Sequence, residues 1–348
     1  TACPAFISIT GIICIMRLLV FEFITGGGFI NKPLPQSLLQ EGYLMRNALL
    51  DDLRVLNDLE VLVLQDERIA FASETNNEYI SYLTVSEGSD IQQLLSEKSS
   101  LYDAVWLVAP ETDGILACWA QFFNKQGKQM CLSGQGAIDL CQDKLATFDS
   151  LKKARIACVP SFLFDPNVVI KPGSWVLKAN NSVGCDEVYL LQEEQHRQKV
   201  LARLIPEQRY ILQPYVSGKV LSLSCLFYQG QAFFICCNEQ QMKIEQQQFV
   251  LSACRVNVQA GKFEQYQQLC QSVAVVIPKL FGYIGIDFIE TEAGENLILE
   301  INPRLTSSYA GINEATGLNV AELVLGMSDY KVPILKKTKN QSVLVDIN

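Results

Sequence analysis

The stretch YIGIDFIETEAGENLILEINPR, residues 283–304, decides the fold of this chain. Two apolar runs flank Ala293-Gly294, which is the pattern of two antiparallel strands joined by a tight turn. With the turn centred between those two residues, Asp287 faces Glu300 across the strands. Alternation along a strand puts Asn302 on the same face as Glu300. Three oxygen-bearing side chains are therefore predicted to converge on one patch.

The rest of this hairpin is predicted to be apolar. The same register places Glu290 opposite Leu297. Alternation assigns four apolar residues to the other, core-facing side: Ile286, Phe288, Leu299 and Ile301.

The paired acids indicate a metal site. Carboxylates directly opposite each other destabilise a hairpin, and a divalent cation removes that cost. Carboxylate and amide oxygens suit Mg²⁺ shared with substrate phosphates. In the alternative, the acids face solvent and a register slip separates them, but the apolar neighbours favour the metal interpretation. Arg304 follows the patch, where its guanidinium could hold a phosphate oxygen or form a surface salt bridge.

Composition limits the function. The chain has 348 residues and a formal net charge of -9, which argues against a general nucleic-acid binder. His196 is the single histidine, so histidine-based triads and histidine-ligated zinc are disfavoured. The twelve cysteines include no C-x-x-C pair, which favours free thiols in a reducing cytoplasm.

The first half of the chain is predicted to form a parallel sheet with helices. Apolar runs at 18–23, 61–64 and 104–109 are typical of buried strands, and 38–53 has helical spacing. Glycines at 26–28 follow the first of these strands, as is common where an open α/β sheet begins. Residues 1–15 are apolar but short for a membrane span. We interpret them as an upstream extension outside the fold, with a membrane anchor as the less favoured alternative.

The second half of the chain has an α+β pattern. We expect helices near 192–204 and 262–281, and we interpret the Gln-rich stretch 239–248 as a solvated turn and strand edge. The tail after Tyr330 is expected to be loosely attached. Short strands are predicted at 175–178, 210–213, 220–228, 231–237, 284–290 and 297–302.

Two lysines and one linker are typical of a nucleotide site. Lys178 ends a predicted strand and precedes small polar residues, which favours a phosphate grip. Lys144 opens a predicted helix. Without further context, we would interpret it as an ordinary exposed lysine. The linker Gln213-Pro214-Tyr215-Val216 offers backbone groups and apolar side chains to a flat base.

These pieces, in this order, resemble the ATP-grasp superfamily over residues 16–330. The resemblance implies a Rossmann-like domain (16–142), a small ATP-grasp lobe (143–216), a C-terminal lobe with the metal site (217–330) and a tail (331–348). It implies ATP and Mg²⁺ or Mn²⁺ as cofactors. It also implies roles for individual residues: phosphate contacts from Lys144, Lys178 and Gly184; nucleotide contacts from Gln213, Pro214, Tyr215, Val216 and Ser222; metal ligation by Asp287, Glu300 and Asn302; and catalysis by Lys178 and Arg304.

A narrower resemblance concerns three segments: 21–28, 110–114 and 305–311. Together they are similar to the tyramine-glutamate ligase group, which builds the methanofuran or methylofuran carrier of one-carbon metabolism. The chain also departs from the superfamily pattern. Its phosphate loop, 180–187, contains a single glycine, Gly184, and Val220 stands where related ligases often have a ribose-binding glutamate.

The resemblance implies an ATP-dependent carboxylate-amine ligase that works through an acyl phosphate. Its expected substrates are an amino-acid carboxylate and an amine, with no nucleic-acid or membrane partner. Related enzymes often dimerise, so a homodimer is one expectation. The glycine loop 26–28 and the stretch 306–309 are candidate substrate contacts; in the alternative, they are a tight turn and a helix start. In the competing hypothesis, the chain is an ATP-binding scaffold or regulatory subunit without turnover.

Overall fold

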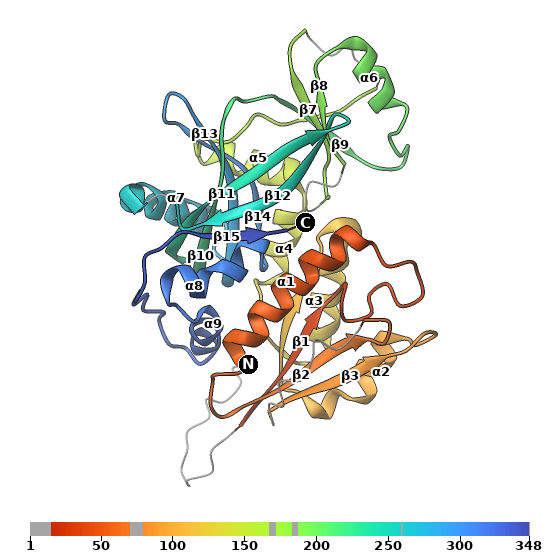
Figure 1. Cartoon of the computed structure of the whole chain (residues 1–348), viewed down its shortest axis with the longest axis vertical. Coiled ribbons are helices and arrows are strands. Elements are labelled where there is room, and N and C mark those ends of the chain that lie inside the picture. Colours follow the sequence, from red (N-terminus) through yellow and green to blue (C-terminus); the bar gives the residue numbers. More distant parts are fainter. Residues whose placement is uncertain (1–14, 70–78, 167–171, 183–186, 259, 348) are drawn as a thin grey trace.

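A computed structural model describes residues 15–69, 79–166, 172–182, 187–258 and 260–347. In this part of the chain the strands form one parallel sheet and one antiparallel sheet (Figure 1). This confirms the predicted combination of α/β and α+β architecture. The extension hypothesis concerns residues 1–15, of which 1–14 lie outside the described residues.

The parallel sheet has the strand order β3-β2-β1-β4-β5. Its strands are β1 (Met16–Glu22), β2 (Leu59–Asp66), β3 (Ile80–Val85), β4 (Ala104–Val108) and β5 (Gln129–Met130). The helices that accompany it are α1 (Gln36–Leu53), α2 (Ile91–Glu97) and α3 (Ile115–Lys125). The predicted helix and the strand predicted at 61–64 lie within these elements, and the other two predicted strands extend one residue beyond β1 and β4. β3 was not predicted, because three of its six residues are exposed and the strand lacks a buried apolar run.

The central strand β1 is buried on both faces, as in other parallel sheets covered by helices. Leu18 and Val20 pack in a core with α1, whereas Leu19 and Phe21 pack in a second core with α3. The core on the α1 side continues into helices near the C-terminus, so α1 lies between the sheet and α9 (Val320–Ser328) (Figure 1). One cluster thereby joins the first and last parts of the chain.

The antiparallel sheet has ten strands in the described residues, in the order β14-β13-β10-β11-β12-β8-β7-β9-β6, with β15 beside β12. Its strands are β6 (Phe162–Leu163), β7 (Trp175–Ala179), β8 (Val188–Leu191), β9 (Tyr210–Pro214), β10 (Gly218–Tyr228), β11 (Gln231–Glu245), β12 (Gln248–Val256), β13 (Gly282–Thr291), β14 (Asn296–Asn302) and β15 (Val343–Asp346). The remaining helices are α4 (Gln135–Gln142), α5 (Lys144–Lys153), α6 (Glu194–Leu201), α7 (Phe263–Val276) and α8 (Ile312–Thr316).

One expectation for the second half is wrong, and another is confirmed in part. The tail is not loosely attached, because β15 pairs with β12 between Val343 and Asp346. The Gln-rich stretch contains both strand and turn: β11 continues through it to Glu245 and pairs with β12, which begins at Gln248. Polar residues obscured the length of β11, whose last three residues are all exposed. They also concealed β15, because the tail is rich in lysine.

Hydrogen bonds fix α1 against the C-terminal lobe. The Asp52 carboxylate is buried and accepts hydrogen bonds from Tyr309 Oη and from Asn313 Nδ2, both at 2.7 Å. Asn319 Nδ2 donates to the Asp52 carbonyl at 2.7 Å. These contacts set the position of α1 relative to the segment that follows β14.

In the described residues, no helix is both long and apolar enough to cross a membrane.

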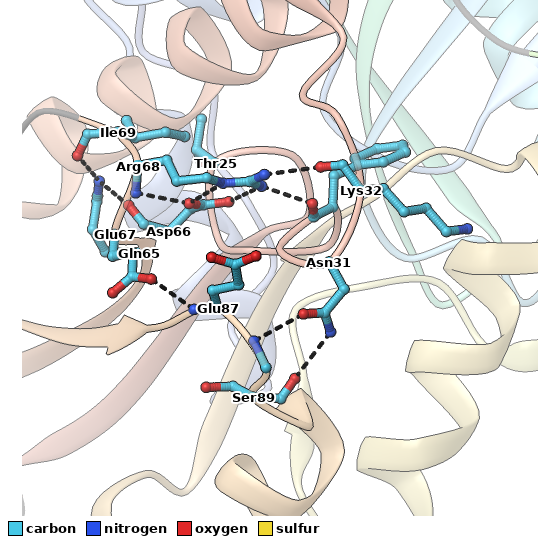
Figure 2. Close-up of polar contacts among 12 residues, drawn as sticks. Thr25, Asn31, Lys32, Gln65, Asp66, Glu67, Arg68, Ile69, Glu87 and Ser89 are labelled. Carbon is cyan, nitrogen blue, oxygen red and sulfur yellow. Dashed lines mark hydrogen bonds and ion pairs between the residues drawn. The ribbon is translucent and has the colours of Figure 1, made fainter.

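The glycine loop after β1 is held by packing and by one arginine. Arg68 donates to the Phe29 and Lys32 carbonyls at 2.7 and 2.8 Å, and the buried Asp66 carboxylate holds its guanidinium (Figure 2). Gly27 has φ +93°, and a Cβ there would meet Val85 at 2.8 Å. The loop is thus a tight, buried turn, and its glycines do not line the cavity described next.

Candidate functional site

A cavity of about 310 Å³ lies where the antiparallel sheet meets the N-terminal domain. Strands β7, β9, β10, β13 and β14 contribute to its wall, together with the first residue of α5. The predicted site residues that the structure describes all line it: Lys144, Lys178, Gln213, Pro214, Tyr215, Val216, Ser222, Asp287, Glu300, Asn302 and Arg304. Gly184 lies outside the described residues.

The paired acids lie side by side on β13 and β14. Asp287 pairs with Glu300, and Asn302 pairs with Gly285. Asn302 Nδ2 donates to Asp287 Oδ2 at 3.1 Å. Burial, and then the Glu300 carboxylate, raise the pKa of Asp287 to about 7. The two carboxylates therefore share a site in which a cation would stabilise both charges.

The register beyond this pair differs from the prediction. A bulge follows Asp287, so Glu290 faces Asn296 and not Leu297. The bulge also changes the position of Leu299, which lines the cavity and is not in the core, where Ile298 takes its place. A bulge inserts one extra residue in one strand and so shifts its alternation. Simple counting from the turn could not reveal it.

Two lysines meet Glu300 from the opposite wall. Lys144 Nζ and Lys178 Nζ lie 3.5 and 3.7 Å from Glu300 Oε2, and both lysines are buried. Burial acts to raise the pKa of Glu300, but Lys144, Lys178 and Arg304 outweigh it, so the pKa lies below its ordinary value. Glu300 is therefore held ionised beside two cations.

Local structure aims both lysines. The Asp143 side chain caps α5 by accepting a hydrogen bond from Ala146 N at 2.9 Å, which makes Lys144 the first helical residue. Lys144 Nζ donates to the Ser182 carbonyl. In β7, Leu177 packs in the core of the small lobe, so alternation turns Lys178 toward the cavity. The exposed-lysine alternative for Lys144 is therefore wrong.

The donor set fits a magnesium ion. Asp287, Glu300 and Asn302 offer hard oxygen ligands on one wall of a cavity that also holds two lysines. In the described residues, no cluster of three or more His, Cys, Asp or Glu could hold a metal. Two carboxylates and an amide would suit Mg²⁺, which usually completes its shell with water and phosphate oxygens.

The linker between the lobes forms one edge of the cavity. Gln213 is buried, and its Nε2 donates to Ser161 Oγ at 2.7 Å, while Tyr215 is 42% exposed. Aliphatic side chains and one aromatic side chain complete the nearby wall: Val159, Val176, Val188, Val220, Met242, Phe249 and Leu251. A slot with apolar walls and backbone groups along one edge can hold a flat heterocycle.

Arg304 forms a buried ion pair. Its Nε and Nη2 both lie 2.9 Å from Glu111 Oε2, and its Nη1 donates to the Leu305 carbonyl at 2.9 Å. The side chains are 11% and 5% exposed, so the surface salt-bridge alternative is wrong. Glu111 follows β4 in the other sheet, and the pair therefore links the two halves of the chain at the cavity.

Replacing Glu111 with Gln is expected to lower the free energy of unfolding by about 3 kcal/mol, because it leaves a buried guanidinium without its counter-ion. The matched control is Asp103→Asn, which breaks the Arg17–Asp103 pair, whose side chains are 40% and 57% exposed. We expect the control to cost less than about 1 kcal/mol. Denaturant unfolding of both variants checks this, and equal losses would contradict it.

Two polar residues at the cavity, Gln240 and Glu41, were not predicted from the sequence. Gln240 Nε2 donates to Asp287 Oδ1 at 3.0 Å from β11, and Glu41 reaches the cavity from α1. Alternation along β11 could have indicated Gln240. Glu41 carried no signal, because its approach depends on how α1 packs against the C-terminal lobe.

Comparisons with known proteins agree with this architecture. The sequence matches the ATP-grasp domain family over residues 141–308 and the pre ATP-grasp 3 domain over residues 59–138. The search of curated proteins found no match. Two similar structures are an ATP-grasp superfamily protein from Archaeoglobus fulgidus (18% identity, 95% of this chain and 92% of that chain, TM-score 0.69) and L-amino acid ligase from Bacillus licheniformis (12%, 92% and 75%, 0.66).

A third similar structure contains a nucleotide. It is the biotin carboxylase domain of 2-oxoglutarate carboxylase from Hydrogenobacter thermophilus with MgADP and bicarbonate, at 14% identity, 93% and 71% coverage of the two chains and a TM-score of 0.66. Adjacent family matches span most of the sequence, and the fold agrees with these structures over more than nine-tenths of the chain. The chain therefore belongs to the ATP-grasp superfamily.

Proposed function

We propose that this protein is an ATP-dependent carboxylate-amine ligase that forms an amide bond through an acyl phosphate. One observation carries the proposal: two buried lysines lie within 4 Å of a glutamate that is paired with an aspartate on a cavity wall. Such a site can neutralise a polyphosphate, because fixed cations and a metal would surround its charges.

Each group of cavity residues has a role in this proposal. Asp287, Glu300 and Asn302 would hold Mg²⁺ or Mn²⁺, which supplies positive charge to the transferred phosphoryl group. Lys144, Lys178 and Gly184 would contact phosphate oxygens. The linker 213–216 would hold adenine, and Ser222 would face the ribose.

The reaction needs two displacements. An oxygen of the substrate carboxylate attacks the γ-phosphorus of ATP, and ADP leaves with the bond electrons. The amine nitrogen then attacks the acyl carbon, inorganic phosphate leaves, and the nitrogen loses a proton. The protein contributes mainly orientation and charge neutralisation. Lys178 lies beside the phosphoryl site, and Arg304 would carry the incoming carboxylate or phosphate on the N–H groups that Glu111 leaves open.

The resemblance to tyramine-glutamate ligases supports glutamate and tyramine as the first substrates to test. The similarity in fold to an L-amino acid ligase supports small amino acids and amines as a class. The test is to incubate the protein with Mg²⁺-ATP, glutamate and tyramine and to measure ADP and the amide product. Formation of both, dependent on both substrates, is the expected result.

The competing proposal is an ATP-binding scaffold without turnover. Val220 favours it, because this apolar side chain lines the cavity where related ligases often have a ribose-binding acid. Measurable ATP binding without ADP formation, across a panel of amino acids and amines, would support the scaffold and overturn the ligase.

A further inference from the structure

Glu41 is an acidic side chain of the cavity that nucleotide binding does not use. The described residues that line the cavity include three acids: Glu41, Asp287 and Glu300. The latter two are paired with each other and have Lys144, Lys178, Gln240 and Asn302 as neighbours. Glu41 comes from α1 and is the one described lining residue from the N-terminal sheet domain.

The Glu41 carboxylate has little compensation for its charge. Ser307 Oγ donates to Glu41 Oε1 at 3.3 Å, and this is its one hydrogen bond to the described residues. Arg304 is the nearby cation, but its Nε and Nη2 lie against Glu111 and its Nη1 bonds the Leu305 carbonyl. Burial raises the pKa of Glu41 even though Arg304 acts to lower it. An incoming cation would therefore stabilise the ionised carboxylate.

Neighbouring residues make the position rigid and polar. Asp52, three turns further along α1, holds the helix to Tyr309 and Asn313, so Glu41 stays opposite Ser307. Thr306 and Ser308 line the same part of the cavity, and the Thr306 and Ser308 hydroxyls are 3.0 Å apart. Hydroxyls beside a carboxylate can accept the remaining hydrogens of an ammonium group.

We infer that Glu41 is the anchor for the ammonium group of the amine substrate, with Ser307 as its positioning partner. The ammonium passes one proton to the Glu41 carboxylate before its nitrogen attacks the acyl carbon, and the nitrogen loses a second proton as the amide forms. The inference rests on the proposed ligase function and assigns it a substrate class: small primary amines that arrive as cations. Neutral nucleophiles gain nothing from this contact, and anionic ones are repelled.

The test compares a cationic nucleophile with a neutral one in Glu41→Gln, which keeps the size of the side chain. With glutamate and Mg²⁺-ATP, the KM for tyramine is expected to rise at least about tenfold, as for a lost charged contact. Hydroxylamine is uncharged at neutral pH and traps the acyl phosphate as a hydroxamate. Its rate and the KM for glutamate should stay within about twofold of the wild type.

The matched control is Asp51→Asn, which removes one negative charge from the exposed side of the same helix. It should leave the KM for tyramine unchanged. An unchanged tyramine KM in Glu41→Gln would overturn the assignment, and so would an equal loss with hydroxylamine or a raised glutamate KM. If the wild type forms neither ADP nor hydroxamate, the ligase proposal itself fails, and the assignment fails with it.

Discussion

Replacing Glu300 with Gln is expected to reduce ATP turnover by about 10²- to 10³-fold, the scale seen when one charge-stabilising group is removed from an active site. Glu300 is the common neighbour of Asp287, Lys144 and Lys178. Its loss removes a metal ligand and leaves the two lysines without their shared counter-ion. ADP release, measured with saturating substrates, checks the prediction.

The same substitution should also lower the stability of the folded state, because Lys144 and Lys178 lose the counter-ion whose pKa they hold below its ordinary value. A partly compensating effect limits this loss. Gln has the shape of Glu, and the change removes the carboxylate repulsion that helps to raise the pKa of Asp287. Sites that bind charged ligands often keep such unfavourable pairs at the expense of stability. Turnover lost in a protein that remains folded at the assay temperature, as its melting curve shows, would therefore separate a functional role from a structural one.

The control for Glu300→Gln is Glu295→Gln. Glu295 is exposed in the turn of the same hairpin, so its replacement should change neither ADP release nor stability. A folded Glu300→Gln protein that keeps turnover within about twofold of the control would remove Glu300 from the metal site.

The fold was predictable where burial alone determines the pattern. β1 and β4 have long apolar runs, since the parallel sheet is covered on both faces. β15 was not predictable, because its four residues pair at an edge and two of them are exposed. Its place beside β12 depends on the path of the tail around the lobe, which local sequence does not encode.

The site was predictable for the hairpin and for the two lysines near strand and helix ends. Counting outward from the turn paired Asp287 with Glu300 correctly because two errors cancel there. The assumed turn centre is displaced from the real one, and the bulge between the turn and this pair shifts the register by one residue. On the turn side of the bulge only the first error acts, so the predicted partner of Glu290 is wrong. Glu41 reaches the cavity, and Glu111 reaches Arg304, through packing between domains. No spacing rule connects them with partners that lie 266 and 193 positions away in the sequence.

Replacing Lys144 with Met is expected to weaken Mg²⁺-ATP binding by about 10- to 100-fold. A charge-assisted hydrogen bond contributes about 1.5–3 kcal/mol, and each 1.4 kcal/mol is a tenfold change in affinity. Methionine keeps the unbranched apolar stem that fills this part of the cavity. The ammonium group is lost, and with it the contacts to the Ser182 carbonyl and to Glu300. Lys178 remains beside Glu300, so binding should be weakened and not abolished.

Calorimetric titration with Mg²⁺-ATP measures the change. Lys153→Met, at the exposed end of the same helix, is the matched control and should bind with wild-type affinity. Equal affinities for the two variants would show that Lys144 serves the apo structure and does not contact the nucleotide.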